Sequence, residues 1–287
     1  MRKTKDFFSL LFFICILASI CLAGDTGSPV AVAMNISYVK DGSALQKLDV
    51  YFQPKATGLP VLVFIHGGAW ISGDKIITKN QAVRMTGHGF VFVSVNYRLS
   101  PFVIHPRHVL DCALAVQWVK KNIHDFGGDS GAMFLAGYSA GGHLCSLLAC
   151  DPRYLDSVEM KPRQIRGYLV MGPGGMDLDR LAQNRSSQSL QEEFFKMIFG
   201  ERSEWKDACP ITHVCGSEPP MFVAVAEFDR LIRRKDCERF VSKSCLLGGN
   251  IRFYIIPGKK HLNAFQPFGN EDDPLTQEIL FFIEENR

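Results

Sequence analysis

The segment that most limits how this chain can fold is Gly137-Tyr138-Ser139-Ala140-Gly141-Gly142. It follows the apolar run 132–136, and a second apolar run of helical composition, residues 143–149, comes directly after it. A strand, a G-x-S-x-G turn and a helix in this order hold a serine hydroxyl exposed as a nucleophile. The positive end of the helix favours negative charge that develops there. Ser139 is therefore the candidate nucleophile, although so short a motif also arises by chance and needs partners.

A glycine-rich segment upstream predicts a second part of such a site. The apolar run 61–65 is typical of a strand buried on both faces, and His66-Gly67-Gly68-Ala69-Trp70 follows it. Acyl transfer passes through a tetrahedral oxyanion that needs backbone N–H donors at close range. We expect Gly67, Gly68 and Ala140 to supply these donors and Trp70 to line a substrate pocket. Taken alone, the two glycines also fit an ordinary turn after a strand.

Two later strand-like runs, residues 221–226 and 252–257, each end just before a group that can complete the site. The carboxyl ends of parallel strands meet at one edge of a sheet, and this arrangement has the chain order nucleophile, acid, histidine. We predict that His261 takes the proton of Ser139 and that Asp229 orients the imidazole. Glu227 is the competing acid, but it lies nearer the strand than the loop where the acid belongs.

The other histidines fit this site less well. Four of them precede Ser139, which is the wrong chain order: His88, His105, His108 and His124. His213 lies in a loop beside Pro210, and a lone histidine of this kind is usually structural. His143, one turn into the helix after Ser139, is a candidate for lining the pocket.

Strand-like and helix-like runs alternate along the rest of the chain. Residues 36–40 and 48–52 are expected to form leading antiparallel strands, and residues 107–124 show apolar side chains at helical spacing. The alternation predicts an α/β fold, with a mostly parallel twisted sheet and helices on both faces. The polar segment 176–218 departs from it and is expected to overhang Ser139 as a small cap. Its apolar side chains either line the pocket or fix the cap to the domain: Phe194, Phe195, Met197, Ile198 and Trp205.

These motifs together resemble a known superfamily. The matching segments are His66-Gly67-Gly68 with Gly73-Asp74, residues 96–101, Asp111 with Trp118, residues 126–129, the Ser139 motif and residues 210–214. From about residue 48 onward the chain resembles the α/β-hydrolase superfamily, in its His-Gly-Gly branch of hormone-sensitive-lipase-like carboxylesterases. Within that branch it is similar to feruloyl/acetyl esterase-like and arylformamidase-like enzymes. The resemblance implies an α/β-hydrolase fold and a serine hydrolase. It departs at Cys209, usually serine, and at Ala69, where arylformamidases tend to carry tyrosine.

The N-terminus has the pattern of a secretory signal peptide. Arg2, Lys3 and Lys5 precede an apolar stretch, residues 7–23, that ends in small residues. This stretch is short for a membrane span, which needs about 20 residues. We expect residues 1–23 to be a cleaved signal peptide, residues 24–287 to form one domain, and the protein to be secreted or lumenal. An uncleaved leader that tethers the protein to a membrane is the alternative. Sequons at Asn35 and Asn184 are candidate glycosylation sites on this route.

Cysteine usage leaves a disulfide open. The chain has nine cysteines, of which Cys15 and Cys21 lie in the leader, so an odd number remains. Three of them have the surroundings of small core residues on helices: Cys112, Cys145 and Cys150. Cys209 and Cys215 are close enough in the sequence to close a short loop.

The charge balance argues against a nucleic-acid partner. The formal net charge is +3, and without the leader, which carries three basic residues and one acidic residue, it is +1. The basic runs 233–235 and 259–260 are short and typical of solvated faces. No metal-binding spacing such as H-E-x-x-H or paired C-x-x-C occurs, and the predicted mechanism needs no cofactor. The expected partner is a small-molecule ester, and no stable membrane span is expected after leader cleavage.

We therefore expect a serine carboxylesterase that hydrolyses small carboxylic esters through an acyl-enzyme intermediate. An arylformamidase-like amidase is the alternative that the resemblance allows. An alternative of another class is a non-catalytic secreted binding protein on a hydrolase scaffold. Such proteins usually lack one of the three catalytic groups, and none is missing from this sequence.

Overall fold

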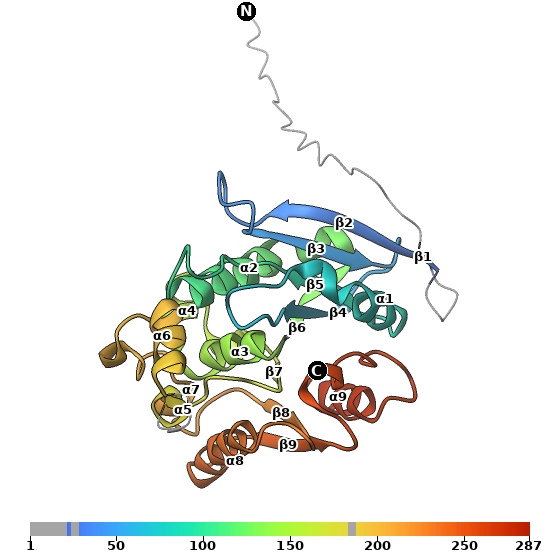
Figure 1. Ribbon diagram of the computed structural model, residues 1–287. Helices are drawn as coiled ribbons and strands as arrows, with labels where there is room; N and C mark the ends of the chain where they lie inside the picture. Colours follow the sequence, from blue (N-terminus) through green and yellow to red (C-terminus); the bar gives the residue numbers. More distant parts are fainter. Residues whose placement is uncertain (1–21, 24–28, 183–187) are drawn as a thin grey trace, which may run out of the picture.

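The computed structural model describes residues 22–23, 29–182 and 188–287. Within these residues the fold is built on one sheet of nine strands. The strand order is β1-β2-β3-β5-β4-β6-β7-β8-β9 (Figure 1). The leading strands pair antiparallel: β1 (Leu22–Ala23), β2 (Pro29–Ser37) and β3 (Lys47–Phe52). The others run parallel: β4 (Leu59–Ile65), β5 (Val91–Val95), β6 (Gly128–Tyr138), β7 (Gly167–Met171), β8 (Met221–Ala226) and β9 (Ile251–Ile256).

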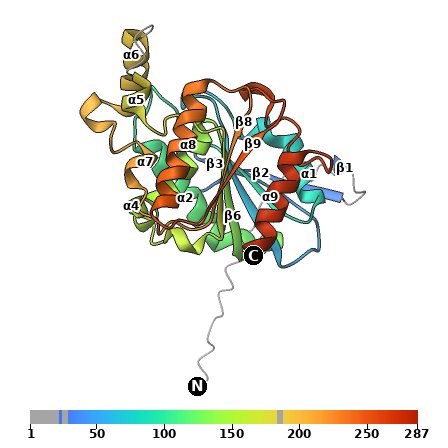
Figure 2. The same ribbon diagram turned by 90° about the horizontal axis from the view of Figure 1, so that it is seen from below.

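Helices cover both faces of this sheet, which explains why its parallel strands are apolar throughout. Along β4, Val63 and Ile65 belong to one core, and Leu62 and Phe64 belong to the other. The first core is covered by α2 (Arg107–Asn122), α3 (Ala140–Cys150) and α8 (Leu231–Leu246). The second is covered by α1 (Lys79–Gly87) and α9 (Pro274–Glu285) (Figure 2). The predicted α/β fold is confirmed.

The carboxylate of Asp111 on α2 joins two loops to the main body. It is fully buried and accepts hydrogen bonds from the side chain of Gln46, at 2.8 Å, and from the guanidinium of Arg98, at 2.8 and 2.7 Å. The Arg98 loop continues to Ser100, whose N–H donates to the carbonyl of Trp70 at 2.9 Å. The ion pair between Arg98 and Asp111 therefore helps to hold Trp70, the predicted pocket residue, in place.

The first leading strand differs from the prediction. We expected it at residues 36–40, but β2 covers Pro29–Ser37. Its register shifts between Ala33 and Ile36, and Asn35 between them has a positive φ of 58°. The strand begins early because Val30 and Val32 are buried in the second core. The bulge interrupts the alternation that would have revealed the strand in the sequence.

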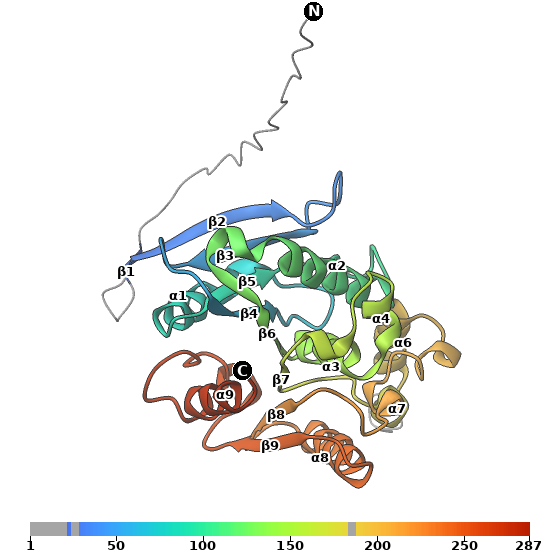
Figure 3. The same cartoon turned by 180° about the vertical axis from the view of Figure 1, so that it is seen from behind.

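The expected cap lies between β7 and β8 (Figures 1 and 3). It contains α5 (Leu178–Ala182), α6 (Gln188–Phe199) and α7 (Pro210–His213), and α4 (Pro152–Asp156) lies before β7. Among the described residues, no helix is both long and apolar enough to cross a bilayer. Apart from Leu22 and Ala23, the expected leader lies outside the described residues.

The short disulfide is absent. Cys209 and Cys215 are both free, and Cys209 is buried whereas Cys215 is exposed. The Sγ of Cys209 lies 3.1 Å from the carbonyl of Trp205 and 3.2 Å from the N–H of Leu178, so this thiol stabilises the cap from within. The three cysteines predicted for the core are buried as expected: Cys112, Cys145 and Cys150.

Candidate active site

Ser139 occupies the sharp turn between β6 and α3. Its φ of 56° and ψ of −115° are unusual for a residue with a side chain, as is typical of a strained functional position. A Cβ on Gly137 would lie 2.1 Å from the carbonyl oxygen of Gly141, and one on Gly141 would lie 2.1 Å from the carbonyl oxygen of Ile65. Both glycines are therefore required by close backbone contacts, which is the physical content of the G-x-S-x-G motif.

The three predicted catalytic side chains meet at this turn. The Nε2 of His261 lies 3.0 Å from the Oγ of Ser139, and its Nδ1 lies 2.9 Å from Oδ2 of Asp229. Asp229 and His261 come from the loops after β8 and β9, as predicted. The competing acid, Glu227, instead accepts a hydrogen bond from the N–H of Gly258 at 2.8 Å.

Asp229 is held from two sides. Its Oδ1 accepts hydrogen bonds from the Arg233 guanidinium and from the N–H of Arg230, the latter at 2.7 Å, which leaves Oδ2 for His261. Burial raises the pKa of Asp229, but the hydrogen bond from His261 and the charge of Arg233 outweigh it, so this pKa lies below its usual range. The carboxylate therefore stays ionised at neutral pH. We did not foresee Arg233, although it follows Asp229 by one helical turn, which is the spacing of an ion pair.

Tyr138 supports the imidazole from the other side. Its ring stacks on His261 with the ring centres 5.2 Å apart, and its hydroxyl donates to the His261 carbonyl. The sequence analysis missed this role. The feature of the sequence that could have indicated this role is the aromatic residue directly before Ser139.

The predicted oxyanion donors surround the serine turn. A Cβ on Gly67 would lie 3.1 Å from the Cβ of Ser139, so the glycine loop passes close to the nucleophile. Gly68 has a φ of 123°, and a Cβ there would lie 2.0 Å from the carbonyl oxygen of Ser72, so this turn requires glycine. Ala140 is the first residue of α3, where the N–H has no partner within the helix. The oxyanion role of the three N–H groups stays a prediction.

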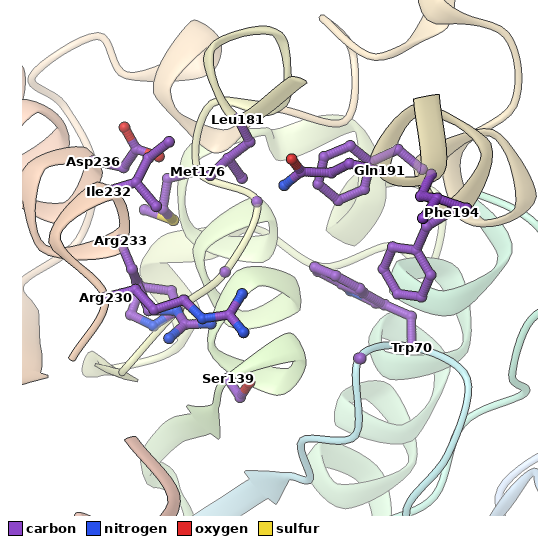
Figure 4. Close-up of a pocket in the computed structure, with 16 residues that line it drawn as sticks. Trp70, Ser139, Met176, Leu181, Gln191, Phe194, Arg230, Ile232, Arg233 and Asp236 are labelled. Carbon is purple, nitrogen blue, oxygen red and sulfur yellow. The ribbon is translucent and has the colours of Figure 1, made fainter. Parts of the chain in front are cut away.

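A cavity of about 510 Å³ opens above Ser139 (Figure 4). Trp70 lines it, as predicted. His143 does not line it, so that prediction is wrong: the ring is fully buried behind Trp70, with ring centres 5.1 Å apart, and its Nε2 lies 2.8 Å from the Ala208 carbonyl. The side chain of His143, one helical turn beyond Ser139, is covered by the cap segment that contains Ala208.

The cap side chains divide between the two expected roles. Phe194 and Phe195 line the cavity. Ile198 and Trp205 are buried in the first core, and Met197 packs against that core while partly exposed. The cap is thus fixed to the domain by one set of apolar residues and faces the cavity with another.

Asp236 on α8 is an unusual group in the cavity wall. It is buried, and within the described residues neither carboxylate oxygen has a hydrogen-bond partner. The Nε of Arg180 lies 3.6 Å away. Burial raises the pKa of Asp236 to about 6, an effect that the charge of Arg180 only partly offsets.

Two other predicted sites can be placed in part. Asn35 is exposed on β2, and Asn184 lies outside the described residues. Within the described ranges, one group has metal-ligand proximity: Asp151, Asp207 and His213. The Nη2 of Arg153 lies 2.6 Å from Asp151 and 2.5 Å from Asp207, so a guanidinium already balances these carboxylates.

Comparison with known proteins places this geometry in a family. The family model BD-FAE matches residues 48–243, which is more than half of the chain. The chain belongs to the BD-FAE family. Among curated relatives of this BD-FAE protein is the probable carboxylic ester hydrolase LipM of Mycobacterium tuberculosis, 34% identical over 73% of this chain and 51% of LipM. Another is the isoprenylcysteine alpha-carbonyl methylesterase ICME of Arabidopsis thaliana, 28% identical over 83% of this chain and 59% of ICME. The chain spans about half the length of the curated relatives that it matches.

Solved structures share the fold of this BD-FAE protein. Esterase B from Lactobacillus rhamnosis, in an inhibited form, has a TM-score of 0.75 at 18% identity and covers 89% of this chain and 87% of its own. The hyperthermophilic esterase from Pyrobaculum calidifontis has a TM-score of 0.69 at 24% identity and covers 93% of this chain and 84% of its own. At these identities the likeness establishes the α/β-hydrolase fold.

The contacts of Asp229 predict which acid supports His261. We expect Asp229→Asn to lower kcat/KM for a 4-nitrophenyl ester about 10³- to 10⁴-fold, because the amide cannot stabilise the imidazolium and favours the wrong tautomer. Glu227→Gln is the matched control and should cost less than about tenfold, since Glu227 bonds to a backbone N–H. Steady-state kinetics on both variants decides between the acids. A larger loss in the Glu227 variant would reverse the assignment.

Asp236 predicts a pH-dependent stability. Its carboxyl keeps a proton to higher pH in the native state than in the unfolded state, so between about pH 4 and pH 6 the native state binds more protons and stability falls as pH rises. Asn at this position cannot titrate. The free energy of unfolding of Asp236→Asn, measured relative to the wild type, should therefore rise by about 2 kcal/mol from pH 4 to pH 7. Urea unfolding of both proteins at the two pH values measures this gain. A stability difference that is the same at both pH values would contradict the prediction.

Proposed function

We propose that this protein is a serine carboxylesterase that cleaves small esters through an acyl-enzyme intermediate. The observation that carries the proposal is the chain of contacts from Ser139 through His261 to Asp229, at 3.0 and 2.9 Å. Membership of the BD-FAE family and relatives named as ester hydrolases support it.

In the proposed reaction, the Oγ of Ser139 attacks the ester carbonyl while Nε2 of His261 takes its proton. Asp229 accepts the Nδ1–H hydrogen bond of His261, which fixes the tautomer and stabilises the imidazolium. The oxyanion that forms is held by the N–H groups of Gly67, Gly68 and Ala140. His261 then returns the proton to the leaving alcohol.

Deacylation follows the same path with water in place of the alcohol. His261 removes a proton from the water, which attacks the acyl carbonyl; as the C–Oγ bond breaks, His261 returns that proton to Oγ of Ser139 and the carboxylic acid is released. The acyl-enzyme forms next to the buried ring of Trp70 and the apolar side chains of the cap, which limit its contact with water. In such surroundings the hydrogen bonds to the oxyanion are stronger than they are in water.

The nucleophile can be tested directly. Wild-type protein should react with a fluorophosphonate probe and hydrolyse 4-nitrophenyl butyrate, whereas Ser139→Ala should lose the labelling and at least about 10³-fold in kcat. Gel fluorescence and steady-state rates measure the two effects. Ser146→Ala, a substitution of a buried serine on the same helix, is the control that should still label. Labelling that survives in Ser139→Ala would refute the nucleophile.

We also propose that residues 1–23 direct the protein into the secretory route, on the basis of the basic start and the apolar stretch in this segment. Expression of the full chain in a eukaryotic cell should give secreted or lumenal protein whose N-terminus starts near residue 24. N-terminal sequencing of that product tests the proposal. Recovery of uncleaved, membrane-bound protein would favour the tethered alternative instead.

A further inference from the structure

The wall of the cavity above Ser139 contains an exposed arginine, Arg230, whose guanidinium has no ion-pair partner within the described residues. Three charged side chains line it: Arg230, Arg233 and Asp236. Arg233 is paired with Asp229, and Asp236 lies 3.6 Å from Arg180. Within the described residues, no carboxylate or hydrogen-bond acceptor contacts the guanidinium of Arg230. The printed hydrogen bonds of Arg230 are made by its backbone: its N–H donates to Asp229, and its carbonyl accepts from the N–H of Arg234.

The Arg230 side chain is directed into this cavity. Figure 4 shows its guanidinium between Ser139 and the cap, with the amide of Gln191 on the opposite side. The rest of the wall is mainly apolar and includes Trp70, Met176 and Phe194. Arg230 itself is exposed, but on the cavity side it faces this apolar wall, where a cation is screened less than on a fully open surface.

We propose that Arg230 is a specificity residue that binds a carboxylate carried by the ester substrate. This inference rests on the proposed esterase function and adds the chemical class of the substrate: an ester with an apolar body and a free carboxylate. A guanidinium suits this ligand because its planar fork donates two parallel hydrogen bonds to the two carboxylate oxygens. The apolar side chains of the cavity then contact the body of the same molecule.

Arg230 lines two hollows beside the catalytic residues, so the position of Arg230 does not assign the carboxylate to one half of the ester. Besides the cavity, it lines a groove of about 460 Å³, together with His261, Lys260 and Leu262. The carboxylate that Arg230 binds can therefore belong to the acyl group or to the alcohol of the ester. The experiment uses one pair of substrates to test each case.

The acyl pair consists of mono(4-nitrophenyl) adipate and its primary amide, and the alcohol pair consists of 4-carboxyphenyl butyrate and 4-carbamoylphenyl butyrate. Within each pair the two members differ only in one terminal group, which is a carboxylate or a neutral amide of nearly the same size. We expect the wild type to prefer the carboxylate in at least one pair by about tenfold in kcat/KM, as a charge-assisted bidentate contact in a partly open site predicts. The pair that shows the preference identifies the half of the ester that carries the anion.

Arg230→Gln should reduce that preference about tenfold, and Arg230→Lys should retain part of it because the charge remains. The backbone N–H that holds Asp229 is present in both variants. Lys235→Gln is the matched control: it removes a positive charge from the helix that Arg230 precedes, at a position that lines a different groove, so the preference should persist. Raising the salt concentration should weaken the wild-type preference.

The outcomes separate this inference from the proposed function. Hydrolysis of both members of each pair at equal rates by the wild type would overturn the role of Arg230 and leave the esterase intact. A preference that survives in Arg230→Gln, or that disappears equally in Lys235→Gln, would also overturn it. Failure of the wild type to cleave any of the four esters, together with absence of fluorophosphonate labelling, would instead reject the esterase itself.

Discussion

The close approach of three backbone segments at the Ser139 turn is the constraint on which the site depends. β6, α3 and the end of β4 come so near one another that a methyl group on Gly137 or Gly141 would overlap a carbonyl oxygen. This contact fixes Ser139 in a strained conformation and brings it beside Gly67. The apolar strands buried on both faces supply the stability that offsets the strain.

The reacting groups were predictable because each follows a strand that is unmistakable in the sequence. Buried parallel strands read as continuous apolar runs, and their carboxyl ends meet at one edge. Ser139, Asp229 and His261 therefore converge as soon as the sheet is correctly ordered, and their contacts match the expectation.

What the sequence did not reveal depends on contacts between distant segments. The ring of His143 lies on the nucleophile helix, but it turns away from the cavity because the carbonyl of Ala208, in the cap, accepts its hydrogen bond. Cys209 and Cys215 are six residues apart, yet one is buried inside the cap and the other faces solvent. The bulge at Asn35 likewise hides the start of β2. The two wrong predictions, for His143 and for β2, and the disulfide that the sequence left open all concern local patterns whose outcome a long-range contact decides.

The two arginines at the start of α8 illustrate how one helical turn separates two tasks. Arg233 lies one turn beyond Asp229 and contacts its Oδ1, so the carboxylate is oriented before any substrate arrives and only Oδ2 faces His261. Arg230 comes before that turn, where its backbone N–H supports the same oxygen while its side chain is free to point into the cavity. The acid therefore needs no further cation, and the exposed guanidinium of Arg230 remains available at the cavity for a ligand. No contact within the described residues engages that guanidinium, and its position in the cavity wall is what makes a ligand its proposed partner.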